Sequence, residues 1–374
     1  MNLIFDCTAL SRWEGQFTGI SRVILEIGTK LGQWVPSCTT GVLDSTDGIW
    51  RHYDPESRTT GDVIAMPPQS LIVTLGANWD HQDHHAALMG CVAQGARLGV
   101  LYYDTIPISH PQSYGPGFPP IYEKWLKETL EAASTSFAIS ENSARDIQTF
   151  CQANGLADRE VHVLRLGDNL PEPRDNPSED IVEKAAVPYL LTVSTVEFRK
   201  NHQMLLNLWR YMIEDLQLDP PNLYIVGRPG WNDGMIQFQI ELDPLLKGRV
   251  QILSDLSDDD LQHLYRNTLF TLYPSIYEGW GLPIAESLCY GKQCVASSKS
   301  SMIEIAPGLT RHAHPLLIEE WVTHIRELTE NPELLAAEQA RIAAEYKIAT
   351  WDQSAHDLAV GLIKQFPTLI AGTP

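Results

Sequence analysis

The sequence predicts an α/β protein made of two consecutive αβ domains, each with a mostly parallel sheet. Short runs rich in Val, Ile and Leu alternate along the chain with longer segments whose apolar residues recur at helical spacing, which is the pattern of βα units. Near the middle, segment 169–187 breaks both periodicities with three prolines and several charges. This composition indicates a linker between two domains of similar size.

Five candidate strands lie in the first half of the chain. They are residues 3–5, 71–75, 98–103, 137–140 and 161–164. Two helices are predicted among them, one with apolar residues from Ile121 to Leu130 and one from Ala144 to Cys151. The stretch VLDSTDGIWRHY is an exception, because Asp47-Gly48 is typical of the turn in a small antiparallel hairpin.

A second alternating series follows the linker. Its candidate strands are residues 189–193, 223–226, 250–253, 269–273 and 294–297, and an amphipathic helix running from Leu205 to Leu216 follows the first of them. We therefore expect an N-terminal domain over 1–168 and a C-terminal domain over 169–348.

Charge and composition exclude several classes of partner. Asp and Glu number 47 against 27 Lys and Arg, a formal net charge of -20 that repels nucleic acid and anionic membranes. No run of apolar residues is long enough for a transmembrane helix, and the first residues lack the basic and apolar segments of a signal peptide. Six cysteines without a CxxC pair indicate reduced core residues. We expect a cytoplasmic protein with no nucleic-acid partner and at most peripheral membrane association.

The most informative stretch runs from Tyr273 to Glu286, with the sequence YPSIYEGWGLPIAE. An apolar strand enters a glycine-rich turn, and Pro283 suits the first position of a helix. The free amides and dipole of that helix start favour an anion, and Gly279 and Gly281 permit close approach of a ligand. Because carboxylates repel phosphate, Glu278 and Glu286 are expected to accept hydrogen bonds from the hydroxyls of a sugar and a ribose.

A second stretch, TVSTVEFRKN over 192–201, also follows a predicted strand. Arg199 and Lys200 supply positive charge in an acidic chain, as neutralising a diphosphate requires. The alternative is a solvated basic pair at a helix start. A third stretch, TGISR around Gly19, suits a loop that passes close to a ligand.

Together these residues resemble the retaining GT-B glycosyltransferases of family four. Glu278 and Glu286 match the family's Glu-x7-Glu motif, TVEFRKN resembles its Arg-Lys-Asn segment, and FTGISRV resembles its amino-terminal glycine loop. Weaker matches are YDTIP, FAISENSARDI, LRLGDN and IVGRPGW. The resemblance extends from about Leu3 to Trp351. It implies the GT-B fold, in which an N-terminal Rossmann-like domain that binds the acceptor and a C-terminal Rossmann-like domain that binds the nucleotide sugar face a cleft. A C-terminal helix over about 349–374 would cross back onto the first domain.

The resemblance also implies roles for individual residues. Arg199 and Lys200 would hold the donor diphosphate, Glu286 the ribose hydroxyls, and Glu278 the transferred sugar. Further donor-binding positions would be Gly19, Ser194, Gly227, Gly279, Trp280, Gly281 and Leu282. Asp104 falls where many relatives contact the donor sugar, with His110 as the alternative. Ser194 stands where glycine is common, and Trp280 where Phe is frequent.

Other polar clusters are alternative candidates for a site. Asp258-Asp-Asp260 resembles a metal-binding DxD, but Ser257 is better placed to cap a helix that begins there. His81, His84 and His85 have a spacing that suits zinc, yet lack a fourth ligand, so a polar helix start or loop is favoured. Asn78 and Trp79 suit a sugar acceptor, as does His110, although a half-buried tryptophan is an equal alternative. We expect no metal and no cofactor beyond the nucleotide sugar.

The expected function is transfer of a sugar from a nucleotide-sugar donor to a glycan or lipid-linked oligosaccharide acceptor, with retention of the anomeric configuration. The expected sugar is mannose and the expected donor is GDP-mannose. The expected setting is cytoplasmic synthesis of a bacterial surface polysaccharide such as an O-antigen or capsule. Any membrane contact is expected at the inner face of the plasma membrane. Two alternatives stay open: a nucleotide-sugar hydrolase or epimerase of the same fold, and a non-catalytic sugar-nucleotide-binding scaffold subunit.

Overall fold

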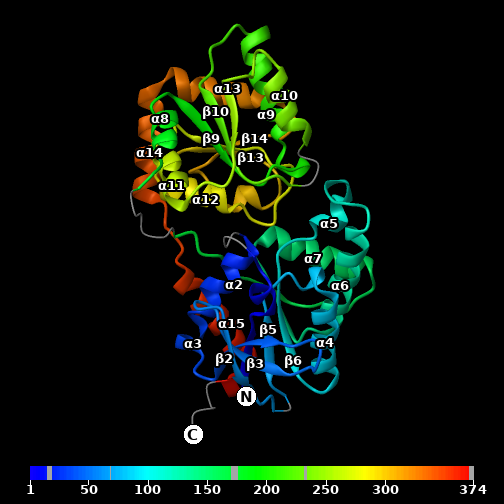
Figure 1. The fold of residues 1–374 in the computed structure, drawn as a ribbon. Helices are drawn as coiled ribbons and strands as arrows, with labels where there is room; N and C mark the ends of the chain where they lie inside the picture. Colours follow the sequence, from blue (N-terminus) through cyan, green and yellow to red (C-terminus); the bar gives the residue numbers. More distant parts are fainter. Residues whose placement is uncertain (15–18, 68, 170–175, 231–233, 370–374) are drawn as a thin grey trace. The chain divides into compact units, whose positions relative to one another are not determined.

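The computed structural model describes residues 1–14, 19–67, 69–169, 176–230 and 234–369, which form two compact units (Figure 1). Unit 1 comprises residues 1–111, 116–167 and 349–374, and unit 2 comprises residues 112–115 and 168–348. Each unit is built on its own sheet with helices on both faces. The predicted α/β class is confirmed.

Unit 1 contains an eight-stranded sheet in the order β4-β3-β2-β1-β5-β6-β7-β8. Its strands are β1 (Leu3–Asp6), β2 (Cys38–Leu43), β3 (Trp50–Asp54), β4 (Thr59–Val63), β5 (Leu71–Thr74), β6 (Arg97–Tyr102), β7 (Thr135–Ala138) and β8 (Val161–Val163). All pairings are parallel except those of β3 with β2 and β4. The predicted hairpin is confirmed as β2–β3, with Gly48 at a φ of 70° in its turn.

The helices of unit 1 cover this sheet. They are α1 (Thr8–Ser11), α2 (Ile20–Gly28), α3 (Leu31–Trp34), α4 (Gln82–Ala93), α5 (Ile106–Ser109), α6 (Phe118–Ala132), α7 (Glu141–Ala153) and α15 (Trp351–Gln365), with 3-10 turns η1 (Asn78–Asp80), η2 (Pro111–Ser113) at the boundary with unit 2, and η6 (Pro367–Leu369). Buried side chains of α4, α6 and α7, such as Leu88, Trp125 and Ile147, form one core with Ile72 and Leu98 of the strands. This core fixes the helices that border the polar loops at the carboxyl ends of the strands.

Helix α15 closes unit 1 by packing against α2 and α3. Thr350 caps its first turn by accepting a hydrogen bond from the Gln353 amide at 3.1 Å. The Trp351 ring lies so close to Gly167 that an added Cβ there would be 2.6 Å away, and Ser354 Oγ donates to the Arg165 carbonyl. These contacts attach α15 to residues 165–167, which follow β8.

Unit 2 contains a six-stranded, fully parallel sheet in the order β11-β10-β9-β12-β13-β14. Its strands are β9 (Tyr189–Val193), β10 (Asn222–Val226), β11 (Val250–Leu253), β12 (Thr271–Tyr273), β13 (Cys294–Ser297) and β14 (Arg311–Ala313). Its helices are α8 (Glu179–Ala185), α9 (His202–Arg210), α10 (Gly234–Leu242), α11 (Asp258–Asn267), α12 (Leu282–Cys289), α13 (Ile318–Glu330) and α14 (Pro332–Glu345), with η3 (Phe198–Lys200), η4 (Tyr211–Asp215, a π-helical turn) and η5 (Ser300–Glu304).

The strand order of unit 2 reverses between β9 and β12, which is the topological switch point of a doubly wound sheet. The segments that follow β9 and β12 lie next to each other at the carboxyl ends of these strands, where the Ile276 amide donates to the Arg199 carbonyl. Arg199 and Lys200 follow β9, and Glu278 follows β12, so the two most informative sequence motifs meet at this point.

The predicted linker is wrong over 179–185, where the structure has helix α8. Ile181 is buried, and it packs in a cluster with Tyr189, Tyr224 and Leu264. The polar composition of this segment reflects the exposed face of a short helix that carries one buried side chain. Residues 170–175 of the expected linker lie outside the described residues.

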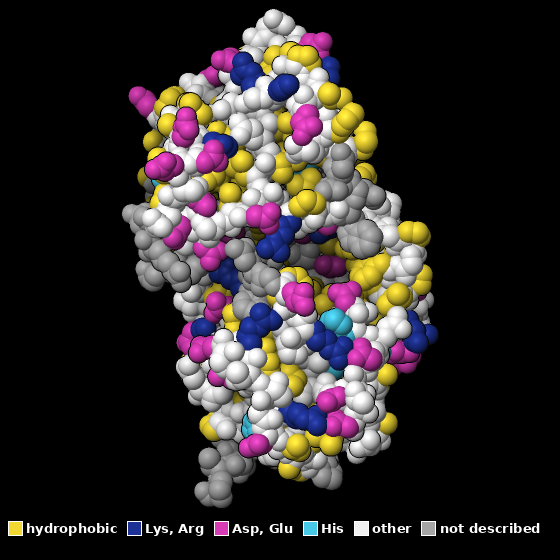
Figure 2. Space-filling model, viewed as in Figure 1, with side chains coloured by type: hydrophobic (Ala, Val, Ile, Leu, Met, Phe, Trp, Pro, Cys, Tyr) yellow, Lys and Arg dark blue, Asp and Glu magenta, His cyan; other side chains and the backbone are white. Residues whose placement is uncertain are grey.

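The surfaces of both units mix charges of both signs. On the face shown in Figure 2, Lys and Arg side chains alternate with Asp and Glu side chains. All six cysteines are free thiols, and Cys7, Cys91, Cys151 and Cys294 are buried. Among the described helices, none has both the length and the apolarity that crossing a membrane requires.

We predict that Gly227→Ala destabilises unit 2. A Cβ at Gly227 would lie 1.9 Å from the Ser194 carbonyl oxygen. This backbone cannot move cheaply, because the Ser194 amide donates to the Val226 carbonyl and the Gly227 amide to the Leu253 carbonyl at the ends of the strands. The expected loss is about 2 kcal/mol or more of unfolding free energy, measured by urea denaturation. Gly90→Ala in α4 is the matched control, because its Cβ would meet nothing within 4 Å, and it should stabilise unit 1 by about 0.4–1 kcal/mol. A Gly227→Ala variant as stable as the parent would contradict the packing described here.

Candidate functional site

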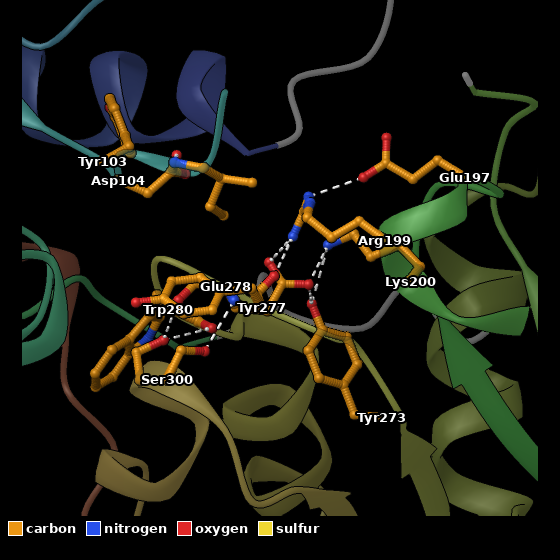
Figure 3. A network of polar contacts seen from close by, with 12 residues as sticks. Tyr103, Asp104, Glu197, Arg199, Lys200, Tyr273, Tyr277, Glu278, Trp280 and Ser300 are labelled. Atoms are coloured by element: carbon orange, nitrogen blue, oxygen red, sulfur yellow. Dashed lines mark hydrogen bonds and ion pairs between the residues drawn. The ribbon is translucent and has the colours of Figure 1, made fainter. Parts of the chain in front are cut away.

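The segment after β9 is anchored to the loop after β12. It forms the short turn η3 and ends at Asn201, whose φ of 62° places it in the left-handed region. The Asn201 side-chain amide donates to the carbonyls of Pro274 and Pro315, at 3.1 and 2.8 Å, and the Ile276 amide donates to the Arg199 carbonyl. These bonds hold Arg199 and Lys200 in place beside the loop that carries Glu278 (Figure 3).

Glu278 binds both cations at once. Its Oε2 lies 2.6 Å from Arg199 Nη1, and its Oε1 lies 2.6 Å from Lys200 Nζ. Glu278 is only 7% exposed, and both cationic side chains are 12% exposed. The alternative of a solvated basic pair is therefore wrong: the two cations are buried in a network with a carboxylate.

Further partners complete this network. Arg199 also contacts Glu197 Oε1 at 2.8 Å and donates to the Tyr277 carbonyl at 2.7 Å. Lys200 Nζ donates to the Tyr273 hydroxyl at 3.2 Å, and that hydroxyl donates to Glu278 Oε1 at 3.1 Å. Arg199, Lys200, Glu197 and Glu278 thus form a cluster with two positive and two negative charges.

The charges within the cluster shift the ionisation of its members. Burial by itself raises the pKa of Glu278, but Arg199 and Lys200 together lower that pKa to about 2. Burial and the neighbouring Arg199 charge lower the pKa of Lys200, and Glu278 opposes this shift. Burial and Lys200 also lower the pKa of His202 to about 4, so His202 is neutral at pH 7.

The lowered pKa of Glu278 predicts a pH-dependent contribution to stability. The ionised carboxylate stabilises the folded state above the unfolded pKa of 4.5, and this stabilisation is lost as the pH falls through the folded pKa of about 2. We expect Glu278→Gln to lose about 3 kcal/mol of unfolding free energy at pH 7, and about half as much at pH 3. Urea denaturation at both pH values tests this. An equal loss of unfolding free energy at the two pH values would show that ionisation of Glu278 does not contribute to stability.

The loop after β12 leads directly into α12. Gly281 is the N-cap residue and offers no side chain, so the first amides of α12 have no side-chain cap, and Pro283 is the second helical residue rather than the first as predicted. A Cβ at Gly281 would meet Ile284 and Ile305 side chains at 3.0 Å, so this glycine also allows close packing. Ser300 Oγ accepts from the Glu278 amide at 2.9 Å, which fixes the loop.

The backbone on either side of Gly279 is also held. Ser301 Oγ contacts the Glu278 and Trp280 carbonyls at 2.9 and 3.1 Å. Trp280 is half-buried and packs against the cluster that contains Tyr273 and Ile284. Gly279, Trp280, Gly281 and Leu282 therefore form a fixed elbow between β12 and α12, as the motif predicted. Their contact with a donor stays a prediction.

Glu286 has a different environment from Glu278. It lies on α12, and its Oε2 accepts a hydrogen bond from the Tyr265 hydroxyl of α11 at 3.1 Å. Tyr265 stacks on Tyr290 with ring centroids 5.2 Å apart. Burial and the nearby Glu286 raise the pKa of Tyr265 well above its usual value, which keeps this hydroxyl protonated as a donor. Within the motif, Glu278 thus binds two cations, whereas Glu286 binds the hydroxyl of Tyr265.

The remaining predicted residues of unit 2 surround β9. Ser194 Oγ lies 3.1 Å from His202 Nε2, and Gly227 lies against the Ser194 carbonyl. The structure explains Gly227 by packing between adjacent strands, a reason that sequence alone did not supply. Sequence analysis also missed Glu197, Tyr273 and Tyr265. The first two lie inside or beside the quoted motifs, whereas no signal in the sequence connects Tyr265 with Glu286.

Three predicted donor-site residues lie in unit 1. Gly19 is the N-cap residue of α2 with a φ of 53°, while Phe17 and Thr18 of the same motif lie outside the described residues. Asp104 Oδ1 accepts a hydrogen bond from the Ile106 amide at 2.8 Å and so starts α5. His110 ends α5, where its Nδ1 lies 2.9 Å from Ser109 Oγ. These contacts give Asp104 and His110 local structural roles, and their contact with a donor stays a prediction.

The histidine and acidic clusters that resemble metal sites are engaged in contacts within the protein. His84 is buried and lies 2.9 Å from Asp6 Oδ2, and His85 lies 2.8 Å from Glu128 Oε2. Ser257 and Asp260 form a capping box at the start of α11, which confirms the predicted helix cap. Within the described residues, no three His, Cys, Asp or Glu side chains are grouped as a metal site requires.

Comparison with known proteins finds similarity to glycosyltransferases. Residues 174–346 match the family model described as glycosyl transferases group 1. Over 235 residues, or 62% of this chain, the sequence is 28% identical to the O-antigen chain mannosyltransferase B of Escherichia coli. That alignment covers 60% of the relative, less than two thirds of its length.

Solved structures share the fold over nearly the whole chain. Sucrose-phosphate synthase from Thermosynechococcus elongatus superposes with a TM-score of 0.68 at 14% identity, covering 98% of this chain and 100% of that one. Anabaena Alr3699/HepE in complex with UDP gives a TM-score of 0.60 at 16% identity, covering 100% of both chains. At such identities these likenesses establish the architecture alone.

Proposed function

The chain belongs with the GT-B glycosyltransferases, and from that premise we propose that it transfers mannose from GDP-mannose to a growing surface polysaccharide with retention of anomeric configuration. The observation that supports this most strongly is the buried Arg199, Lys200 and Glu278 cluster at the switch point of unit 2. The name of the Escherichia coli relative, O-antigen chain mannosyltransferase B, supports mannose as the sugar and a glycan chain as the acceptor.

In the proposed reaction, the bond between the sugar C1 and the diphosphate oxygen breaks as the acceptor oxygen bonds to C1 on the same face. The acceptor hydroxyl proton passes to the departing diphosphate. Arg199 and Lys200 stabilise the charge that develops on this leaving group, together with the uncapped amides at the start of α12. Glu278 orients the two cations, since each of its oxygens lies 2.6 Å from one of them.

Glu286 suits the ribose of the donor. Its carboxylate is half-buried on the first turns of α12, and the Tyr265 hydroxyl fixes one of its oxygens. A carboxylate held in this way can accept hydrogen bonds from two neighbouring hydroxyls. We therefore place Glu286 on the nucleoside side of the diphosphate and Glu278 on the cation side.

A ligand screen followed by a turnover assay tests the proposal. Because a ligand that binds only the folded state raises its stability, GDP should give the largest thermal shift among GDP, UDP, dTDP and ADP. GDP-mannose should then react only when a mannosylated acceptor is present, and the product linkage should keep the donor's anomeric configuration. Turnover without acceptor would instead indicate a hydrolase or epimerase, and binding without turnover a non-catalytic subunit.

A further inference from the structure

Unit 1 has a small polar pocket at the amino ends of the parallel strands β7 and β8. The pocket has a volume of about 250 Å³, and it lies at the start of β7, beside the segment that precedes β8 and the last residue of α15. Ligands of doubly wound sheets bind at the carboxyl ends of the strands, so this pocket is at the opposite edge of the sheet. The polar residues of this amino-end pocket include Thr135, Ser136, Arg159, Glu160, His162 and Gln365.

Two buried donors of the amino-end pocket are unused. Thr135 Oγ1 and Arg159 Nε are both buried, and neither has a hydrogen-bond partner among the described residues. Thr135 is only 4% exposed, so solvent does not reach its hydroxyl freely. Buried donors without partners cost free energy, and they indicate a missing group that accepts hydrogen bonds.

Arg159 is a half-buried cation without a carboxylate partner. Its Nη1 donates to the Ala133 carbonyl at 3.2 Å, and no carboxylate of the described part of the chain is paired with it. Glu160 also lines the pocket, but its side chain is 78% exposed and its Oε1 lies 3.5 Å from His162 Nδ1. A partly desolvated guanidinium is stabilised by an anion that supplies the missing charge.

The charge of Arg159 acts on the interior of unit 1. Burial raises the pKa of the Cys151 thiol at the end of α7, and the Arg159 charge opposes this shift. Cys151 is 2% exposed, so this effect is felt at a buried position. Charges that act through the protein interior are screened less than exposed ones. An anion in the amino-end pocket would therefore gain more from Arg159 than an ion at the open surface does.

The size and the donors of the pocket select a compact oxyanion. Its volume is below the range of about 300–1,000 Å³ that is usual for organic ligands, so a nucleotide is too large. The guanidinium of Arg159 and the hydroxyl of Thr135 supply donors for several acceptor oxygens at once. The far wall is fixed, because the His162 ring contacts the Gln365 side chain and its centroid lies 5.7 Å from that of Phe137.

We propose that the amino-end pocket binds a phosphate group, either as inorganic phosphate or as the phosphate of a small monoester. Arg159 and Thr135 are its main ligands. Because the pocket is lined by β7, the segment before β8 and Gln365 of α15, bound phosphate stabilises the C-terminal helix on the sheet of unit 1. This site is independent of the proposed transfer reaction, which uses Arg199 and Lys200 of unit 2.

Three variants of the full chain test this proposal. Arg159→Gln removes the unpaired charge, and Thr135→Val removes the unused hydroxyl with little change of shape. Arg51→Gln is the control for charge, because Arg51 is a half-buried arginine of the same unit that does not line the pocket. Inorganic phosphate and glycerol 1-phosphate are titrated by calorimetry. Sodium chloride of the same ionic strength is the reference, so general screening cancels. Lys200→Ala is titrated in parallel to detect phosphate bound in unit 2.

We expect inorganic phosphate to bind the parent, Arg51→Gln and Lys200→Ala with similar affinity. It should bind Arg159→Gln at least about tenfold more weakly, and Thr135→Val about fivefold more weakly. Without phosphate, Thr135→Val should unfold at the parental temperature or above it, because it loses no hydrogen bond. Glycerol 1-phosphate binding with the same pattern would identify a site for monoesters, and binding of inorganic phosphate alone a site for the free ion.

Two results would overturn the amino-end pocket as a phosphate site. One is the absence of any phosphate binding by the parent beyond that of chloride. The other is phosphate binding that Arg159→Gln retains in full and Lys200→Ala loses, because the anion would then lie beside the cations of unit 2.

Discussion

Replacing Arg199 or Lys200 with alanine should lower the turnover number at least about a hundredfold. Both side chains lie in η3 after β9 and are 12% exposed, and each is held by Glu278 at 2.6 Å, so their charges are oriented before any ligand arrives. Loss of one preoriented charge removes stabilisation that is needed mainly as the diphosphate departs, so the effect should appear in kcat more than in KM. Steady-state kinetics with GDP-mannose and a mannosylated acceptor measure it.

Arg210→Ala is the control for this pair of variants. Arg210 lies on α9 of the same unit, is 48% exposed, and pairs with Asp243 and Glu214. The Arg210→Ala substitution also removes one positive charge from the chain, but it leaves the cluster of Arg199, Lys200, Glu197 and Glu278 intact. Turnover should therefore stay close to that of the parent. Circular dichroism should confirm that all three variants are folded. Parental turnover in both Arg199→Ala and Lys200→Ala would contradict the assigned role of the cations.

Glu278→Gln should move affinity and rate in opposite directions. The parent cluster contains two positive and two negative charges, and removal of one carboxylate leaves a net positive charge. GDP should therefore bind about tenfold more tightly, because the negative charge of Glu278 no longer repels its diphosphate. Turnover should fall at least about a hundredfold, because Lys200 loses its carboxylate partner and Arg199 keeps only Glu197, so the two cations are no longer oriented together. Calorimetry and steady-state kinetics measure the two effects.

Glu197→Gln is the matched control for Glu278→Gln. It makes the same change of charge in the same cluster, but Glu197 contacts only Arg199 within it and leaves Lys200 bound to Glu278. GDP affinity should rise by a similar factor, while turnover should fall much less. Equal losses of turnover in the two variants would show that net charge, rather than orientation by Glu278, controls the rate.

Much of the fold follows from local sequence pattern. Runs such as 71–75 and 189–193 are apolar and bounded by polar turns, because parallel strands are covered on both faces. By contrast, β4 was missed because all five of its residues are exposed, so no apolar alternation marks it. Helix α8 was missed because only Ile181 among its seven residues is buried. Segments at the edge of a core carry too little apolar signal to be identified.

The candidate site was predictable in its parts but not in its connections. The motif around Arg199 and the glycine elbow at Gly281 were both expected at the carboxyl ends of strands. Their meeting depends on β9 lying next to β12, and strand order is a tertiary property that local pattern does not determine. Glu278 was accordingly expected to face hydroxyls, whereas it binds two cations that lie about 78 residues away in sequence.

A crystal structure of the chain with GDP bound would show whether Arg199 and Lys200 hold the donor diphosphate. We expect diphosphate oxygens within hydrogen-bond distance of Arg199, of Lys200 Nζ and of the backbone amides of Gly281 and Leu282, with the ribose next to Glu286. GDP bound elsewhere on the chain, with Glu278 still engaging both cations and no phosphate beside them, would contradict this expectation.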